Sequence, residues 1–210
     1  SNNEFYLKNC FIQLAPFIDG KWITNSNLDL EETSSLPSDF YLEWNLPKDL
    51  NINSNLTQTD VTEYSERKFI KQSINKVKEI QFHISQKEYV FYSINGINIG
   101  TDMEEVIKEF LDPRPSLFKI ESFITDYFGK FPQNKILLSK MDYMKRPYYG
   151  LTVIPSVLKP FNDIFKFEIK ALSVFLNHYL TEQFLLDPRE NFWLTGGLHS
   201  LLLMEFIDQY

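Results

Sequence analysis

The alternation of apolar and polar residues divides the chain into a strand-rich first part and a helix-rich second part. Apolar side chains occupy every second position over residues 40–46, which predicts a half-buried strand that ends at Pro47. The same period recurs over residues 80–84. It places His83 on the opposite, more polar face of that strand, where we expect a solvated histidine rather than a ligand.

Turn signals fill the intervals between these strands. Residues 19–37 and 48–67 are rich in Asn, Ser, Thr and Asp, and we expect loops there. The pair Asn95-Gly96, flanked by isoleucines, is typical of a two-residue hairpin turn.

Beyond residue 100 the period of the apolar residues becomes helical. Thr101 and Glu104 fit a capping box that opens a helix ending before Pro113. A long helix is expected over residues 163–186, and Pro188 suits the first position of the next one, with Asp187 as its N-cap. The remaining expected elements are a helix over 116–129 and strands over 135–141 and 150–154.

These elements together predict an α+β protein. We place a boundary near residue 95, with a β-rich N-terminal domain over residues 1–95 and an α/β domain over residues 96–210. The second domain would combine a small mixed sheet with packed helices. Because both ends of the sequence are abrupt, we expect the chain to be part of a longer protein.

Composition narrows the classes of function. The net charge is −7 and Lys and Arg never cluster, which argues against a nucleic acid or an anionic membrane as partner. Cys10 is the single cysteine, so an intramolecular disulfide and a cysteine-based zinc site are excluded. No apolar run reaches membrane-spanning length and the first residues lack a signal-peptide pattern, so we expect a water-soluble domain of undetermined compartment.

Candidate chemistry lies on the long helix. His178 and Glu182 are four residues apart, and so share one face of the helix. Zinc metallopeptidases use this spacing in H-E-x-x-H, where two imidazoles bind the metal and the Glu is the general base. The same spacing on a buried helix also suits a hydrogen-bonded His–Glu pair with no metal.

Four short segments, in order along the chain, resemble those of zinc aminopeptidases of the aminopeptidase N type. They are Ile124–Pro132 (ITDYFGKFP, similar to F-x-x-Y-F-G-x-x-Y-P), Lys135–Leu138 (the strand that follows), Tyr149–Thr152 (YGLT, similar to W-G-L-I after G-A-M-E-N) and Trp193–Gly197 (WLTGG, similar to W-L-N-E-G). The resemblance covers about residues 75–210. It implies a thermolysin-like domain preceded by the tail of a β-sandwich-like domain.

Carried over residue by residue, the resemblance implies a zinc site that has lost most of its groups. His178 matches the first zinc ligand, whereas Tyr179 stands where the family has its general base. Glu182 stands at the second ligand and Gly196 at the third. Pro147 replaces the Glu that binds the free amine of the substrate. The interval from Glu182 to Gly196 is also about five residues shorter than in the family.

These replacements favour a catalytically degenerate metallopeptidase-like domain without a cofactor, serving as a scaffold, peptide-binding or interaction module. Its partner would be a peptide or a protein. The alternative is a metal-dependent peptidase in which His178, Glu182 and His199 bind zinc, because His199 lies one turn beyond Gly196. A third possibility is an α+β fold unrelated to the peptidases.

Overall fold

The protein is α+β and forms two compact units, each described here by itself. A computed structural model describes residues 4–8, 10, 15, 17–22, 36–103, 112–145, 163–184 and 188–210. The first unit comprises Ser1–Glu88 with Phe184–Asn191, and the second comprises Tyr89–Gln183 with Phe192–Tyr210. The division at residues 88 and 89 falls just before the hairpin whose turn contains the expected boundary near residue 95.

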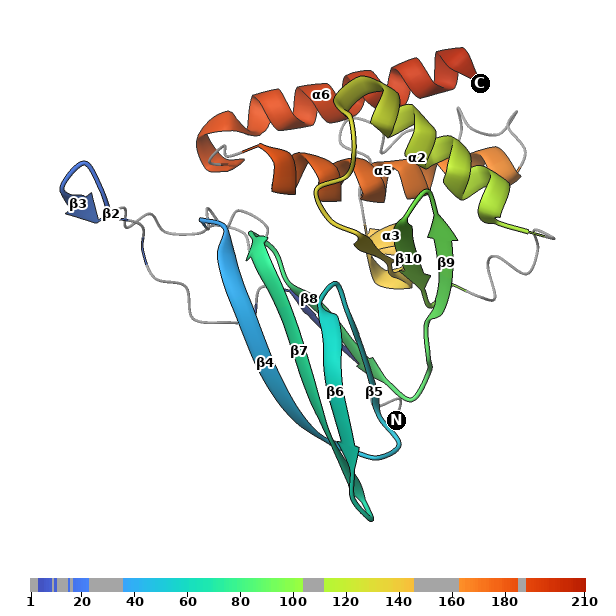
Figure 1. The fold of residues 1–210 in the computed structure, drawn as a ribbon. Helices are drawn as coiled ribbons and strands as arrows, with labels where there is room; N and C mark the ends of the chain where they lie inside the picture. Colours follow the sequence, from blue (N-terminus) through green and yellow to red (C-terminus); the bar gives the residue numbers. More distant parts are fainter. Residues whose placement is uncertain are drawn as a thin grey trace. The chain divides into compact units, whose positions relative to one another are not determined.

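The first unit is built from antiparallel strands. One sheet has the order β4-β7-β6 and another has the order β1-β8-β5, while β2 and β3 form a separate short hairpin. The long strands β4 and β7 pair along nearly their whole length (Figure 1). The strands are β1 (Phe5–Lys8), β2 (Phe17–Ile18), β3 (Lys21–Trp22), β4 (Ser38–Pro47), β5 (Asn51–Ser54), β6 (Thr57–Glu63), β7 (Arg67–Val77) and β8 (Gln81–Ser85).

An apolar cluster joins the two three-stranded sheets of this unit. It takes Leu46 and Ile70 from one sheet and Ile52 and Phe82 from the other. The indole of Trp44 on β4 meets the ring of Phe82 on β8 edge-on, with ring centroids 4.8 Å apart. The alternation expected over residues 40–46 is therefore confirmed, because the apolar side chains of β4 are those that face this cluster.

The expectation of a loop over residues 48–67 was wrong, since β5 and β6 lie there. Strand β5 contains Asn53 and Ser54, both residues that disfavour strands, yet both are buried. The Ser54 hydroxyl donates to the Gln72 side chain over 3.1 Å, so a polar side chain of β7 satisfies this buried hydroxyl. Of the expected loop over 19–37, residues 23–35 lie outside the described part.

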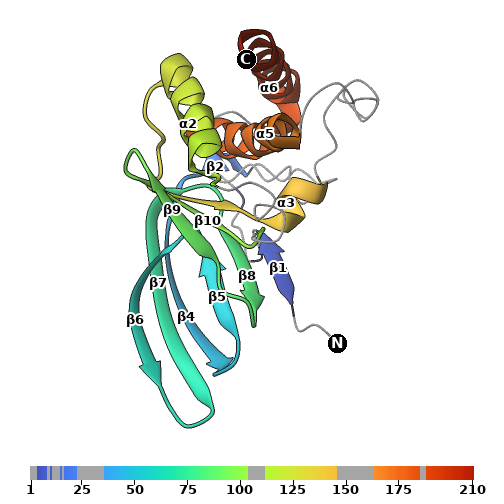
Figure 2. The ribbon, with the colours of Figure 1, turned by 90° about the vertical axis from the view of Figure 1, so that its right-hand side faces the viewer.

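The expectation of a solvated His83 was also wrong. Strand β8 lies between β1 and β5, and all five of its residues are buried (Figure 2). His83 is 2% exposed, its ring stacks on Tyr6 at 3.9 Å, and its Nε2 atom lies 3.1 Å from the Glu4 carboxylate. Strand alternation separates a buried face from a solvated one only where one face of the sheet meets water, which is not so for β8.

The second unit contains a small mixed sheet of order β11-β10-β9. Strand β9 (Val90–Ile94) pairs with β10 (Ile97–Thr101) antiparallel, and β10 pairs with β11 (Lys135–Leu138) in parallel. The expected hairpin is confirmed: φ is 47° at Asn95 and 84° at Gly96. A two-residue turn with both central φ angles positive matches the twist of the flanking strands.

Helices cover this sheet and supply most of its core. They are α2 (Arg114–Phe128), α3 (Lys140–Lys145), α5 (Asp163–Gln183) and α6 (Pro188–Gln209), of which α6 belongs to this unit from Phe192 onward. Both α2 and α5 pack against the strands (Figure 1). Their shared core includes Ile99, Phe123, Phe175 and Phe206, each at most 2% exposed.

Local signals account for the ends of several helices. Gly129 ends α2 with φ of 84°, and α6 begins at Pro188, both as expected. The strand expected to run to residue 141 stops at Leu138, because Ser139 starts α3 as its N-cap. Its hydroxyl accepts the Asp142 N–H over 3.0 Å and donates to the Asp142 carboxylate over 2.8 Å.

Two expected elements lie outside the described residues: the helix before Pro113 and the strand over 150–154. Among the helices that the structure describes, each one is too short or too polar to cross a lipid bilayer.

A buried ion pair connects α2 to α5. Glu168 is 6% exposed, and its carboxylate lies 2.6 Å from the Lys119 ammonium and accepts the Ser116 hydroxyl over 2.8 Å. The ammonium also lies 5.2 Å from the ring centroid of Phe206 and 4.3 Å from that of Tyr210, both on the α6 side. One cation thus contacts all three long helices of the unit.

We expect Glu168→Gln to lower the free energy of unfolding by about 2 kcal/mol, because it leaves the largely buried Lys119 ammonium without its counter-charge. The measurement is urea denaturation followed by helical circular dichroism. Asp112→Asn is the matched control, since Asp112 pairs with Arg114 over 2.8 Å but both side chains are well exposed. Its cost should stay below about 1 kcal/mol. Equal losses in the two variants would contradict a special role for the buried pair.

Candidate functional site

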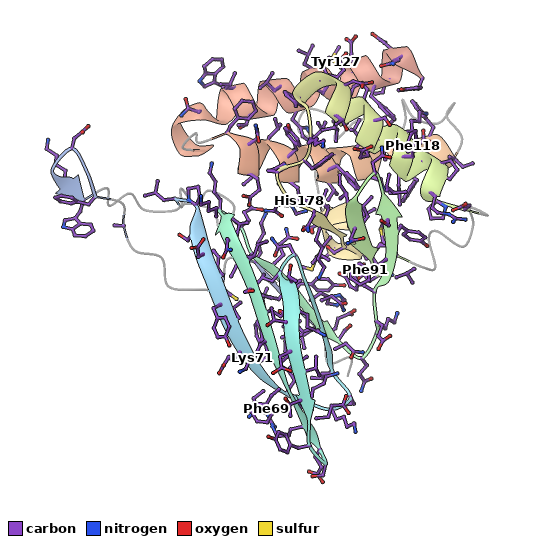
Figure 3. The ribbon with its side chains drawn as sticks, in the orientation of Figure 1. Phe69, Lys71, Phe91, Phe118, Tyr127 and His178 are labelled. Carbon is purple, nitrogen blue, oxygen red and sulfur yellow. The ribbon has the colours of Figure 1, made fainter. Side chains whose placement is uncertain are left out.

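Helix α5 places the candidate residues of the site. His178 and Glu182 are both half-buried and lie one turn apart on the same face of the helix. His178 is labelled in Figure 3. All residues of Ala171–Leu176 are buried and all except Ser173 are apolar, so this part of the helix packs on the core of the second unit.

Tyr179 is turned into the core of the second unit. It is 1% exposed, and its hydroxyl donates to the Phe128 carbonyl over 2.8 Å. Its ring stacks on that of Phe128 at 5.3 Å and meets the ring of Phe131 edge-on at 5.1 Å. The side chain therefore holds the C-terminal end of α2 against α5.

This environment keeps the Tyr179 phenol protonated. Burial raises the pKa of Tyr179 above its ordinary value, because the phenolate would lose its hydration. The phenol proton is already donated to a backbone carbonyl, which can only accept. A general base must accept a proton near neutral pH. The phenol of Tyr179 stays protonated there and donates its proton, so it does not act as one.

His199 on α6 faces α5. It is 6% exposed, and its Nε2 atom lies 3.1 Å from both the hydroxyl and the carbonyl oxygen of Ser173. A carbonyl oxygen accepts hydrogen bonds only, so Nε2 carries the proton and donates. In this arrangement Nε2 is not a zinc ligand, and the lone pair of the neutral ring lies on Nδ1.

Two contacts define how α5 and α6 lie beside each other. Phe165 stacks on Phe206, and Ser173 meets His199, which makes the two helices antiparallel neighbours. Gly196 lies three residues before His199 on α6, about one turn along that helix. It is half-buried.

The geometry does not bring the alternative ligand set together. Across the described residues, the donor atoms of His178, Glu182 and His199 do not form a group close enough to hold one metal ion. Pro147, which replaces the family's amine-binding Glu, lies outside the described residues.

The second unit contains another buried carboxylate, which the sequence analysis did not single out as a candidate site residue. Glu121 on α2 is 4% exposed, accepts the Asn95 side-chain amide over 2.6 Å and accepts the Thr125 hydroxyl over 2.9 Å. Its position in the sequence could have predicted its burial, because it lies four residues after Leu117 and three before Ile124, on the apolar face of the helix. A carboxylate at such a position needs polar partners from elsewhere in the fold.

No protein-family model matches the chain, and no curated protein matches it either. The likeness to zinc aminopeptidases therefore rests on the four short segments, and the function has to be argued from the residues and their geometry.

We expect Tyr179→Phe to lower the free energy of unfolding by about 1 kcal/mol at pH 7.5, since the Phe128 carbonyl loses its donor. The difference from wild type should shrink above pH 10. Because the folded pKa is raised, the contribution of the phenol is complete below the ordinary value near 10 and is lost as pH rises toward the folded value.

The check is urea denaturation of both proteins at pH 7.5 and 10.5. Tyr64→Phe serves as control because Tyr64 is 60% exposed, and it should leave stability unchanged at pH 7.5. A wild-type advantage that grows between pH 7.5 and 10.5 would contradict the assignment of Tyr179 as a buried donor.

Proposed function

We propose that this chain is a catalytically degenerate metallopeptidase-like domain that acts as a scaffold or a peptide-binding module. The observation that carries the proposal is the placement of Tyr179. The residue that follows the candidate ligand His178, where the resembling peptidases have their base, is used for core packing and for a hydrogen bond to α2.

The chemistry of a zinc peptidase needs groups that this chain does not offer at the matching positions. A catalytic zinc requires three protein ligands around an open position and a base beside the bound water. Gly196 has no side chain to bind a metal, and Tyr179 donates where a base must accept. His178 and Glu182 supply two donor groups at most.

The contacts of the neighbouring residues support the same conclusion. His199, the candidate third ligand of an alternative site, donates through Nε2 to the Ser173 carbonyl, and across the described residues it does not form a metal-sized group with His178 and Glu182. Tyr179 and His199 thus fasten α5 to α2 and α6 respectively. Polar groups at this place in the fold contribute to stability, and stability does not require a bound metal.

We expect the protein purified without added metal to contain no stoichiometric zinc, because two ligands bind zinc too weakly to retain it. The measurement is elemental analysis of the wild type beside His178→Ala. About one zinc per chain in the wild type, lost in the variant, would contradict the proposal. Hydrolysis of aminoacyl chromogenic substrates that is sensitive to chelator and to His178→Ala would contradict it equally.

Restoring the ligands of the resembling peptidases at positions 182 and 196 tests whether these two positions and His178 still lie close enough to bind one zinc ion. We expect the double variant Glu182→His, Gly196→Glu to gain a zinc-dependent rise in its unfolding midpoint, because zinc would bind the folded state preferentially. Without zinc its midpoint should fall below that of wild type, since the new carboxylate at position 196 lies half-buried and lacks a counter-charge.

The controls are the two single variants, neither of which completes three ligands. Thermal unfolding is recorded for all four proteins with and without zinc. A rise limited to the double variant supports the correspondence with the peptidase site. A folded double variant that zinc leaves unchanged would show that Gly196 does not correspond to the third ligand.

A further inference from the structure

We infer that a polar pocket beside the β9–β10 turn binds a small molecule or peptide end that carries a primary ammonium group next to a carbonyl. The pocket has a volume of about 580 Å³ and is lined by the turn at residues 95–97, one side of α2 and the loop at residues 130–134. This volume suits a ligand of about one or two amino-acid residues. None of the lining residues belongs to the His178 group, so the inference does not depend on whether that group binds a metal.

The charge of Glu121 favours a cationic ligand. Its carboxylate lines the pocket, is 4% exposed and accepts hydrogen bonds from the neutral side chains of Asn95 and Thr125. Within the described part of the chain, no Lys, Arg or His side chain lies within ion-pair distance of it. A buried carboxylate without a cation is costly, and a ligand ammonium would supply the missing counter-charge.

The carboxylate has room for that ammonium. Each of its oxygens accepts one bond from the protein, and a carboxylate offers about four acceptor positions. Asp126, five residues further along α2, also lines the pocket and is exposed. Two carboxylates at one pocket favour a cationic group over a neutral one.

Two lining residues of the pocket carry hydrogen-bond donors for a ligand oxygen. The Nε2 atom of Gln133, a lining residue, is buried and has no hydrogen-bond partner among the described residues. Lys130, also a lining residue, is exposed, and its ammonium forms no ion pair within the described part of the chain. Both can donate to an oxygen of the ligand.

Together these groups match one arrangement of atoms. An ammonium would lie near Glu121, and a neighbouring carbonyl or carboxylate oxygen would accept from Gln133 or Lys130. The ring of Phe131 and the side chain of Ile97 offer apolar surface for a short side chain. Free amino acids and peptide N-termini share this chemistry, and the test separates the two sources.

The hydrogen bonds around Glu121 also place the site. Asn95 has a positive φ in the hairpin turn, and its side-chain amide bonds to α2 across the pocket. The turn and the helix are therefore connected before a ligand arrives. A site fixed in this way loses little conformational entropy on binding.

The test is a titration of the full chain, followed by ¹H–¹⁵N correlation spectra at pH 6.5, with L-alanyl-L-alanine, its N-acetyl derivative and L-alanine as probes. At this pH the free amine is largely charged. We expect saturable shifts of the amide signals of residues 95–97 and 122–134 with alanylalanine. Acetylation should weaken binding at least tenfold. Free alanine binding as tightly as the dipeptide identifies free amino acids as the ligand class, and weaker binding identifies peptide N-termini.

Glu121→Gln should weaken the binding of alanylalanine at least tenfold, whereas Asp208→Asn, an exposed carboxylate on α6 outside the pocket, should leave it unchanged. Equal binding of the acetylated and free dipeptides would overturn the inference. So would the absence of saturable shifts with alanylalanine and alanine, or full affinity in folded Glu121→Gln. The comparison of free and acetylated dipeptide uses wild-type protein, so it decides the question even if Glu121→Gln does not fold.

Discussion

The pair formed by Lys119 and Glu168 is the constraint on which the arrangement of the second unit depends. Apolar packing alone lets two helices slide by part of a turn, because many side-chain contacts have similar energy. A charged pair 2.6 Å apart and largely out of water tolerates no such shift. It fixes α2 against α5, and the aromatic rings around Lys119 bring α6 into the same arrangement. The contact of Tyr179 with Phe128 follows from that alignment.

The sequence predicted those elements that depend on residues only a few positions apart. The alternation of β4, the Asn95-Gly96 turn, the glycine that ends α2 and the proline that begins α6 each act within a few residues. Strands β5 and β6 were missed because their Asn, Ser and Thr residues carry turn propensity, and pairing with β8 and β7 overrides it. The burial of His83 likewise depends on β1, whose residues lie more than seventy positions earlier in the chain.

The candidate site divides in the same way. The spacing of His178 and Glu182 is a property of one helix, and the sequence was enough to place them on one face. Tyr179 on α5 donates to the Phe128 carbonyl on α2, and His199 on α6 donates to the Ser173 carbonyl on α5. The role of each side chain therefore depends on a residue of another helix. Residue types alone do not distinguish a general base from a phenol that packs in the core. Only the acceptor that each side chain meets makes that distinction.

Two buried carboxylates of the second unit show how such contacts separate a structural role from a binding role. Glu168 and Glu121 are 6% and 4% exposed, and each accepts a hydroxyl from α2. Glu168 also meets a lysine, so its charge is balanced inside the protein and it needs nothing further. Glu121 meets an amide in place of the cation and borders a pocket. Burial costs the two carboxylates similar amounts of hydration free energy, but only Glu168 has a lysine as counter-charge. The missing counter-charge at Glu121 is therefore the feature that favours a cation supplied by a ligand.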